Sequence, residues 1–248
     1  MKIENYKKLK NGKYRLSFDN SEILDVYEDV ILNLELLLKK DISESLKQKI
    51  LQENEKYDAY AVGLKYLNTR VRSKKEVVDY LRKGEYSFPN IENAISILEK
   101  QGYVNDLNFA KAFLNNRLIT TSNGPYKIKS DLKEKGVSNE VIDEVMEEYT
   151  IDIQKEKIAK QVNRMVKSNR NKGNSLLKRK IFNELSKQGF KRSLIQEYLQ
   201  NLQLDSDQEL RNKEYQKLYQ KLSRKYQGNE LEYKIKEKLY QIGFESSY

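Results

Sequence analysis

The sequence contains no cysteine and no histidine among its 248 residues. Without cysteine, disulfide bonds and thiolate metal sites are excluded. Without histidine, the chain lacks the usual general base of enzymes and the commonest zinc ligand. Catalysis would have to use carboxylates or lysines, and no arrangement of these in the sequence suits it. We therefore predict no catalytic residue, no metal site, no cofactor and no enzymatic activity.

Proline is also scarce. With 2 prolines and 10 glycines, long helices are rarely interrupted, so helix is the default expectation. Only 38% of the residues are hydrophobic, whereas 34% are charged. That ratio is low for a compact globule and typical of thin helical modules with much surface per residue.

Long apolar runs are absent as well. No stretch approaches the roughly 20 apolar residues that a membrane span needs, and the first five residues lack the apolar core of a signal peptide. We expect a cytoplasmic protein without a membrane partner.

No phosphate-binding motif of the GxxxxGK[ST] or GxGxxG type occurs. The segment Lys172–Ser175 lacks the first glycine and the preceding strand of such a loop. The carboxylates of Asp205–Glu209 lie immediately before an amphipathic helix, so we interpret them as an N-cap with favourable dipole charge and not as a metal site.

The beginning of the chain differs from the rest. Polar and apolar residues alternate over Lys13–Phe18, a turn follows at 19–21, and Glu22–Tyr27 extends again. This pattern predicts a β-hairpin, which should lean on a helix near Val30–Lys39 because a lone hairpin is marginally stable.

From residue 42 onward the sequence reads as helices and turns, and one helix recurs. Each copy carries a β-branched residue followed four places later by leucine, which puts both on one helical face. These pairs are Val77/Leu81, Ile128/Leu132, Ile181/Leu185 and Ile235/Leu239. A glycine follows the leucine by four residues, and by three in the first copy. Glycine at this place suits the left-handed backbone conformation that ends many helices. These glycines are Gly84, Gly136, Gly189 and Gly243.

Serines mark the expected starts of the following helices at Ser87, Ser138 and Ser193. Ser73 with Glu76, and Ser193 with Gln196, have the spacing of capping boxes. The repeat length is roughly 51–55 residues, enough for three short helices.

The predicted fold is mainly α: an elongated tandem array of three-helix repeats with a small N-terminal β-hairpin. A coiled coil is disfavoured because glycines and caps interrupt any heptad pattern. The expected division is 1–53 for the hairpin and helices, 54–104, 105–150 and 151–204 for three repeats, and 205–248 for a partial fourth repeat.

The formal net charge is +10, which favours a polyanionic partner. No acidic residue occurs between Lys157 and Asn183, whereas a helix selected only for solubility mixes signs. The nine cations of this stretch therefore suggest a docking face for a polyanion: Lys157, Lys160, Arg164, Lys167, Arg170, Lys172, Lys178, Arg179 and Lys180. Our candidate contact residues among them are Arg170, Lys172, Lys178, Arg179 and Lys180.

Two further basic clusters occupy equivalent junctions between the first and second helices of a repeat. They are Arg70, Arg72, Lys74 and Lys75, and then Arg117, Lys127 and Lys129. Contact with a nucleic-acid backbone fits them better than base readout, and a plain solvated edge remains the alternative. We expect charge reversal at Lys74, Lys75, Lys127 and Lys129 to weaken partner binding while leaving helicity unchanged. Most tyrosines, including Tyr66 and Tyr80, are expected in the core or at interfaces.

Three blocks resemble those of the RecX regulatory proteins. They are Leu67–Glu76 with Tyr80–Lys83, Gly102–Asp106 with Phe109, Ala110 and Arg117, and Gly124–Ile128 with Leu132–Ser138. Together they cover roughly residues 60–150. The combination is specific, although each block alone would not be.

The resemblance implies tandem three-helix repeats and a regulator of DNA repair, recombination and the SOS response. It implies binding in the groove of the filament of RecA recombinase on single-stranded DNA, which blocks filament extension and lowers ATP hydrolysis and strand exchange. The binding surface it implies comprises Arg70, Arg72, Lys74, Lys75, Arg82, Arg117, Lys127 and Lys129. Expected partners are the filament, single-stranded DNA and, as a further candidate, double-stranded DNA, bound by a monomer.

The alternative is a stand-alone helical-repeat protein that binds nucleic acid without sequence specificity. It would bind DNA tightly without recombinase and with a steep salt dependence. A metal-dependent nuclease is a third class, for which we expect no activity.

Overall fold

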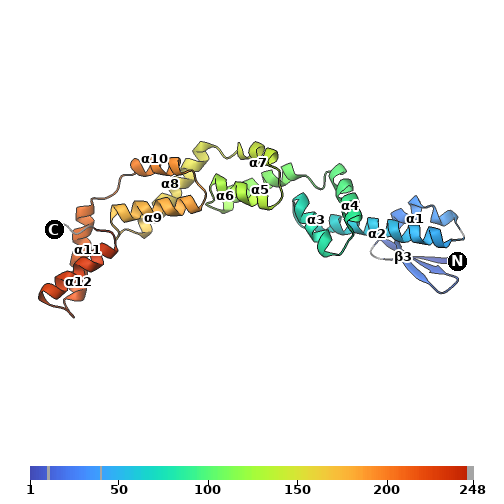
Figure 1. Cartoon of the computed structure of the whole chain (residues 1–248), viewed down its shortest axis with the longest axis horizontal. Helices are drawn as coiled ribbons and strands as arrows, with labels where there is room; N and C mark the ends of the chain where they lie inside the picture. Colours follow the sequence, from blue (N-terminus) through green and yellow to red (C-terminus); the bar gives the residue numbers. More distant parts are fainter. Residues whose placement is uncertain (10–11, 40, 245–248) are drawn as a thin grey trace. The chain divides into compact units, whose positions relative to one another are not determined.

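The computed structural model describes residues 1–9, 12–39 and 41–244. The chain folds as two compact units, one of Met1–Ala112 with Glu134–Val141 and one of Phe113–Lys133 with Ile142–Tyr248. The predicted mainly helical fold with a small N-terminal β element is confirmed (Figure 1). Within the described ranges no helix is long and apolar enough to cross a membrane.

The N-terminal module is a three-stranded antiparallel sheet in the order β1-β2-β3. Strands β2 (Lys13–Phe18) and β3 (Ile23–Tyr27) form the predicted hairpin. Strand β1 (Ile3–Lys8) was not predicted, because its register shifts between Ile3 and Asn5 and its partly buried residues therefore do not alternate. Behind the sheet, a short helix and a 3₁₀ turn replace the single helix expected near 30–39. They are α1 (Glu28–Asn33) and η1 (Leu36–Leu38).

Helix α2 (Glu44–Leu67) belongs both to this module and to the first repeat. It begins at Ser43, whose hydroxyl accepts a hydrogen bond from the backbone N–H of Leu46 at 3.1 Å. Its first half buries Ile50 in the sheet core, whereas Ala59 lies in the core of the repeat. The expected boundary at 53/54 therefore falls inside one continuous helix.

Asp58 on α2 ties the sheet to the first repeat. Its carboxylate accepts hydrogen bonds from Lys13 Nζ and from the Tyr27 hydroxyl, each at 2.8 Å, and from the Tyr86 hydroxyl. Burial opposes the charge, but the bonds from Lys13, Tyr86 and Tyr27 hold the pKa of Asp58 below its usual value. The ionised carboxylate of Asp58 thus connects the sheet, helix α2 and the loop at Tyr86.

The remaining helices follow in the order that the sequence pattern predicts. In chain order they are α3 (Lys74–Lys83), α4 (Phe88–Lys100), α5 (Asp106–Thr120), α6 (Pro125–Glu134), α7 (Asn139–Met146), α8 (Ile151–Ser168), α9 (Asn174–Lys187), α10 (Arg192–Gln200), α11 (Asp207–Leu222) and α12 (Gly228–Gln241). The four β-branched/leucine pairs lie on α3, α6, α9 and α12, and all eight side chains are buried. We call these the second helices, since each is the second of its expected repeat. The expected repeat boundaries stay a proposal, and the start of a third helix near Ser246 lies outside the described residues.

The predicted helix starts are partly confirmed. Ser73 and Glu76 form a complete capping box at α3, and the Ser138 hydroxyl accepts a hydrogen bond from the N–H of Val141 at 3.4 Å. Ser87 holds the N-cap position of α4 without a side-chain bond. The prediction for Ser193 was wrong, because α10 already begins at Arg192 and places this serine inside the helix.

The glycines that end the second helices behave as predicted in three of the four copies. Gly136, Gly189 and Gly243 have φ angles of 81°, 88° and 94°, the left-handed region that glycine tolerates best. The prediction for Gly84 was wrong. It has a φ of −81°, and the exposed Glu85 takes the left-handed position with a φ of 63°.

These three glycines are also contact points between second helices. A Cβ atom on Gly189 would lie 2.5 Å from the backbone nitrogen of Lys127, at the start of α6. Likewise, a Cβ atom on Gly243 would lie 2.5 Å from the Cβ of Leu176 on α9. At α3, a Cβ atom on Gly136 would lie 2.7 Å from the Cβ of Lys75. Helices α3, α6 and α9 therefore each begin against the left-handed glycine that ends the next second helix.

Backbone hydrogen bonds join the same helix ends. The N–H of Gly124 donates to the carbonyl of Gln188 at 2.7 Å, and the N–H of Tyr126 donates to the carbonyl of Gly189 at 3.0 Å. The N–H of Gly173 donates to the carbonyl of Ile242 at 3.0 Å. N–H groups that a lone helix would leave to solvent thus pair with carbonyls at the end of another helix.

Aspartates add a side-chain cap to this arrangement. An Asp106 carboxylate oxygen accepts the backbone N–H of Lys74 at 2.8 Å, and an Asp207 carboxylate oxygen accepts that of Asn174 at 2.8 Å. Helix α6 begins with Pro125, which has no N–H to cap. The interpretation of Asp205–Glu209 is confirmed in part, since Ser206 holds the N-cap position of α11 and Asp207 and Glu209 lie in its first turn. Ser206 makes no side-chain cap bond, however, and the carboxylate of Asp207 caps α9.

We predict that Gly189→Ala destabilises the protein more than Gly102→Ala. Both glycines have positive φ angles, so each substitution should cost about 1–2 kcal/mol. A Cβ atom on Gly102 meets nothing within 4 Å, whereas one on Gly189 collides with the backbone of α6, which should add about 1–3 kcal/mol. Urea unfolding measures both costs, and equal losses would contradict the contact.

We predict that Asp58→Ala lowers the free energy of unfolding by about 1–3 kcal/mol near neutral pH, because two tyrosine hydroxyls and Lys13 lose their acceptor. Because the folded-state pKa of Asp58 is depressed, its contribution is complete above the ordinary carboxyl pKa and is lost as pH falls through the folded-state value. The difference between wild type and variant should therefore shrink in acid unfolding series. A difference independent of pH would contradict this role.

Candidate polyanion interface

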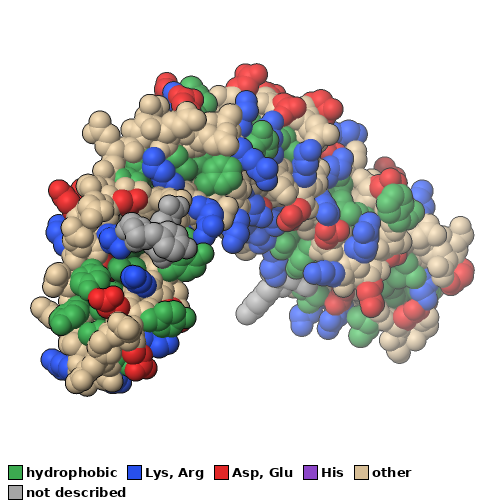
Figure 2. Space-filling model, turned by 60° about the vertical axis from the view of Figure 1, so that its left-hand side comes forward, with side chains coloured by type: hydrophobic (Ala, Val, Ile, Leu, Met, Phe, Trp, Pro, Cys, Tyr) green, Lys and Arg blue, Asp and Glu red, His purple; other side chains and the backbone are tan. Residues whose placement is uncertain are grey.

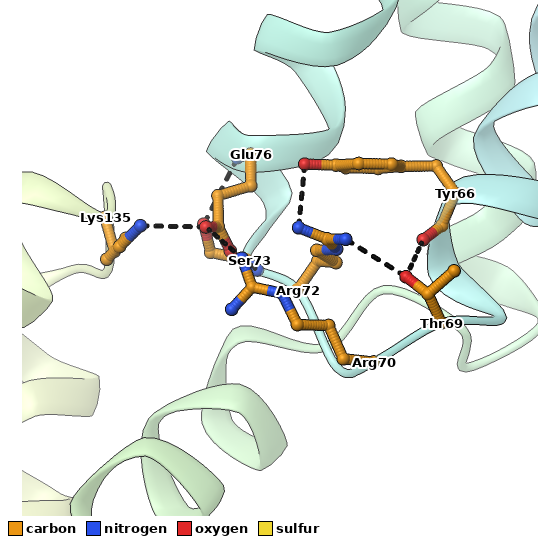
Figure 3. Close-up of polar contacts among 7 residues, drawn as sticks. All are labelled: Tyr66, Thr69, Arg70, Arg72, Ser73, Glu76 and Lys135. Carbon is orange, nitrogen blue, oxygen red and sulfur yellow. Dashed lines mark hydrogen bonds and ion pairs between the residues drawn. The ribbon is translucent and has the colours of Figure 1, made fainter. Parts of the chain in front are cut away.

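The segment between α2 and α3 holds Arg72 in a defined position. The guanidinium of Arg72 lies over the ring of Tyr66, 3.9 Å from its centroid, and Nη1 donates to the hydroxyl of Tyr66 at 2.9 Å. Nη2 donates to the hydroxyl of Thr69 at 3.0 Å (Figure 3). The ring of Tyr66 also stacks on that of Tyr80, with 3.9 Å between the ring centroids. The expectation that both tyrosines serve packing is met in part, because Tyr80 remains 41% exposed.

Glu76 holds two further cations beside Arg72. One of its carboxylate oxygens lies 2.8 Å from Lys135 Nζ and 3.3 Å from Arg70 Nη2, as Figure 3 shows. Burial opposes ionisation, but the bond from Lys135, the Ser73 N–H and the charge of Arg70 hold the pKa of Glu76 below its usual value. Glu76 is therefore a carboxylate at neutral pH.

We call Arg70, Arg72, Glu76 and Lys135 the arginine cluster. Two of its three cations pair with its one carboxylate, and the four side chains together carry an excess of two positive charges. Arg72 has no acidic partner among the described residues, and its Nε is buried without a hydrogen-bond partner. A guanidinium whose orientation is already fixed suits bidentate contact with phosphate or carboxylate.

Lys74 and Lys75 contact other parts of the chain. Lys74 Nζ pairs with Glu99 at 2.8 Å, and Lys75 Nζ donates to the carbonyl of Glu134 near the end of α6 at 3.0 Å. These contacts give both lysines a role in holding the junction together. Charge reversal at Lys75 would place a carboxylate against that carbonyl, so for this residue we now expect a loss of stability.

The other predicted residues of the junctions also have partners within the chain. Arg82 lies 3.7 Å from Asp79. Lys127 and Lys129 pair with Asp131 and Asp143 at 2.7 and 2.6 Å. The guanidinium of Arg117 lies 4.8 Å from the ring centroid of Phe113. That these residues bind a partner stays a prediction.

The predicted cations of the acid-free stretch do not share one face. Lys178, Arg179 and Lys180 are successive residues of α9, so their side chains point about 100° apart. Lys180 Nζ donates to the side-chain oxygen of Asn169 at 2.8 Å, and Arg179 lines a hollow with Tyr240. Arg170 and Lys172 line a different hollow.

Two groups of cations lie outside the candidate contact residues, although the second belongs to the acid-free stretch for which a docking face was predicted. Lys135 joins the arginine cluster from the end of α6, 59 residues after Glu76, and no local pattern predicts that contact. Lys160, Arg164 and Lys167 lie together on α8 and are exposed. Their i, i+4, i+7 spacing could have identified them as one helical face.

The surface is mixed in sign. Lys and Arg side chains lie beside Asp and Glu over much of the face drawn in Figure 2, as the ion pairs above require. Net charge alone is therefore a poor guide to a binding surface here. The candidate binding surfaces for a polyanion are those where Lys and Arg side chains outnumber the carboxylates beside them.

Two family models match the chain. The model for the first three-helix domain of RecX matches residues 59–98, and the model for the second three-helix domain matches residues 105–146. These ranges extend from within α2 to α4 and over α5 to α7.

Curated relatives extend the similarity along the chain. A "Regulatory protein RecX" from Listeria innocua is 33% identical over 178 residues, which cover 72% of this chain and 66% of the relative. One from Bacillus pumilus is 31% identical over 241 residues, covering 95% of this chain and 92% of the relative. The crystal structure of a regulatory protein RecX superposes with a TM-score of 0.70 at 23% identity, covering 79% of this chain and 97% of that one. The chain belongs to the RecX family of regulatory proteins.

Proposed function

We propose that this protein binds the RecA recombinase filament and its single-stranded DNA and inhibits filament extension, ATP hydrolysis and strand exchange. It would thereby act in the cytoplasm to control DNA repair and recombination, including the SOS response. We propose that it acts as a monomer, by binding and without catalysing a reaction.

Membership of the RecX family supports the regulatory part of this proposal. The arginine cluster supports the binding part, and it is the observation that carries it. Its cations exceed its carboxylate, and stacking and hydrogen bonds orient Arg72 before any partner arrives. A preoriented side chain loses less conformational entropy on binding, and a cationic surface accelerates association with a polyanion.

The first test is the ATPase rate of RecA on single-stranded DNA. Addition of the protein should lower that rate at amounts stoichiometric with the recombinase. An unchanged rate would contradict the proposal. If the protein bound DNA tightly without any effect on the recombinase, a stand-alone nucleic-acid-binding protein would be the better description.

We predict that Arg72→Lys weakens this inhibition while preserving net charge. Lysine cannot reproduce the planar, stacked fork of arginine, so we expect a roughly tenfold higher concentration for half-inhibition, which corresponds to about 1.4 kcal/mol. Arg192→Lys, at the exposed start of α10, is the matched control and should behave as wild type.

Equal inhibition by wild type and Arg72→Lys would remove the arginine cluster from the binding surface. Circular dichroism and thermal unfolding of both variants report whether the substitution has acted through the fold instead.

A further inference from the structure

Helix α8 carries a row of cations that the arginine cluster does not include. Lys160, Arg164 and Lys167 are exposed, and none has an acidic partner among the described residues. Their spacing of three or four residues puts them on one face, with neighbouring Cβ atoms about 5–6 Å apart. Regular steps of this size suit successive phosphates along one extended strand.

The end of α5 forms a wall beside this row. A hollow of about 370 Å³ lies between residues 118–122 on one side and α8 on the other, where Lys160 and Arg164 line it. A second, more open hollow of about 540 Å³ continues past the same two residues to Lys167 and Ser168. The two hollows share residues, so they form one continuous surface, which we call the α8 groove.

Side-chain bonds fix the wall of the α8 groove. Lys157 Nζ donates to the carbonyls of Leu118 and Thr121 at 2.6 and 2.8 Å, and the side-chain amide of Gln161 donates to the hydroxyl of Ser122. Lys157 thereby neutralises carbonyls at the end of α5 that would otherwise repel an anion. Burial and the neighbouring charge of Lys160 lower the pKa of Lys157, as expected beside a concentration of positive charge.

The groove offers apolar as well as cationic contacts. Ile119 is 85% exposed on its wall, where it can contact a sugar or the face of a base. Glu156 lines one end of the groove, so a polyanion is favoured from Lys160 toward Lys167 and disfavoured beyond Glu156. No other carboxylate lines either hollow among the described residues.

We propose that the α8 groove binds the sugar–phosphate backbone of a single nucleic-acid strand. Contact with phosphates needs no particular base, so binding should be independent of sequence. The inference deepens the proposed function, because it assigns the DNA strand to a specific surface. It is tested without recombinase, so that the two proposals can fail separately.

The test compares two triple variants of the full chain that remove the same charge. Lys160→Gln, Arg164→Gln and Lys167→Gln empty the groove of its cations. Lys217→Gln, Lys234→Gln and Lys238→Gln form the control, since these side chains contact neighbours on their own helices, α11 and α12. Fluorescence anisotropy of a labelled oligothymidylate gives the Kd of each protein as a function of salt.

We expect the groove variant to bind at least about tenfold more weakly at low salt. Its plot of log Kd against log salt should be shallower by about 2, from about 0.7 for each of three lost phosphate contacts. The control variant should keep the wild-type slope. Equal losses in both variants, or no binding by the wild type, would overturn the proposal.

Two further measurements keep the outcome clear. Glu156→Gln leaves the cations in place and should tighten binding severalfold, which tests the groove even if the triple variant fails to fold. Poly-glutamate should displace the oligonucleotide less well than unlabelled oligothymidylate of equal charge. Equal displacement would assign the groove to an acidic protein segment and overturn the proposal.

The recombinase assay separates this inference from the proposed function. If the wild type inhibits RecA but the groove variant binds DNA normally, only the assignment of the groove is wrong. If the groove variant loses DNA binding but the wild type does not affect RecA, the groove assignment stands and the regulatory proposal is wrong.

Discussion

The repeats are connected where the beginning of one second helix contacts the glycine that ends the next. A helix N-terminus leaves N–H groups without partners, and a left-handed glycine exposes backbone without a Cβ atom. The structure combines these two features, so that carbonyls at one helix end accept N–H groups at another. Aspartates at the start of α5 and α11 complete the capping. Because these contacts set the position of each helix start, they also position the basic side chains that follow it.

The cations at these junctions therefore fall into two kinds: some stabilise the junction, and others remain without an acidic partner. Lys75 lies against Gly136 and Glu134 and stabilises the junction itself, whereas Arg72 on the same segment has no acidic partner among the described residues. The arginine cluster and the α8 groove share this second property. Stacking and hydrogen bonds orient Arg72 without neutralising it, and Lys160, Arg164 and Lys167 have no acidic partner among the described residues. Cations that remain unneutralised are what a surface for a polyanion requires.

Much of the fold could be predicted from the sequence because its signals are local. The i, i+4 pairs, the left-handed Gly136, Gly189 and Gly243, and the Ser73 capping box depend on residues within a few positions. Strand β1 could not be predicted, since its register with β2 is irregular. Helix α10 begins at Arg192 without a side-chain cap bond, so no cap residue marks its start in the sequence. The candidate site was harder to predict, because charge is visible in a sequence but pairing is not. Lys135 reaches Glu76 across 59 residues, and Asp207 caps a helix 33 residues before it.

Helix α3 differs from the other three second helices, α6, α9 and α12, in the residue that follows its C-terminal end. Glu85 stands where the later copies have glycine, so an additional module placed before α3 would meet a side chain at its docking point. No such obstacle exists between α9 and α12, where both surfaces already have the matching form. A preceding second helix could therefore dock at the end of α3 in the same way only if Glu85 were replaced by glycine. The side chain of one glutamate thus distinguishes the end of α3 from the three helix ends that accept a neighbour.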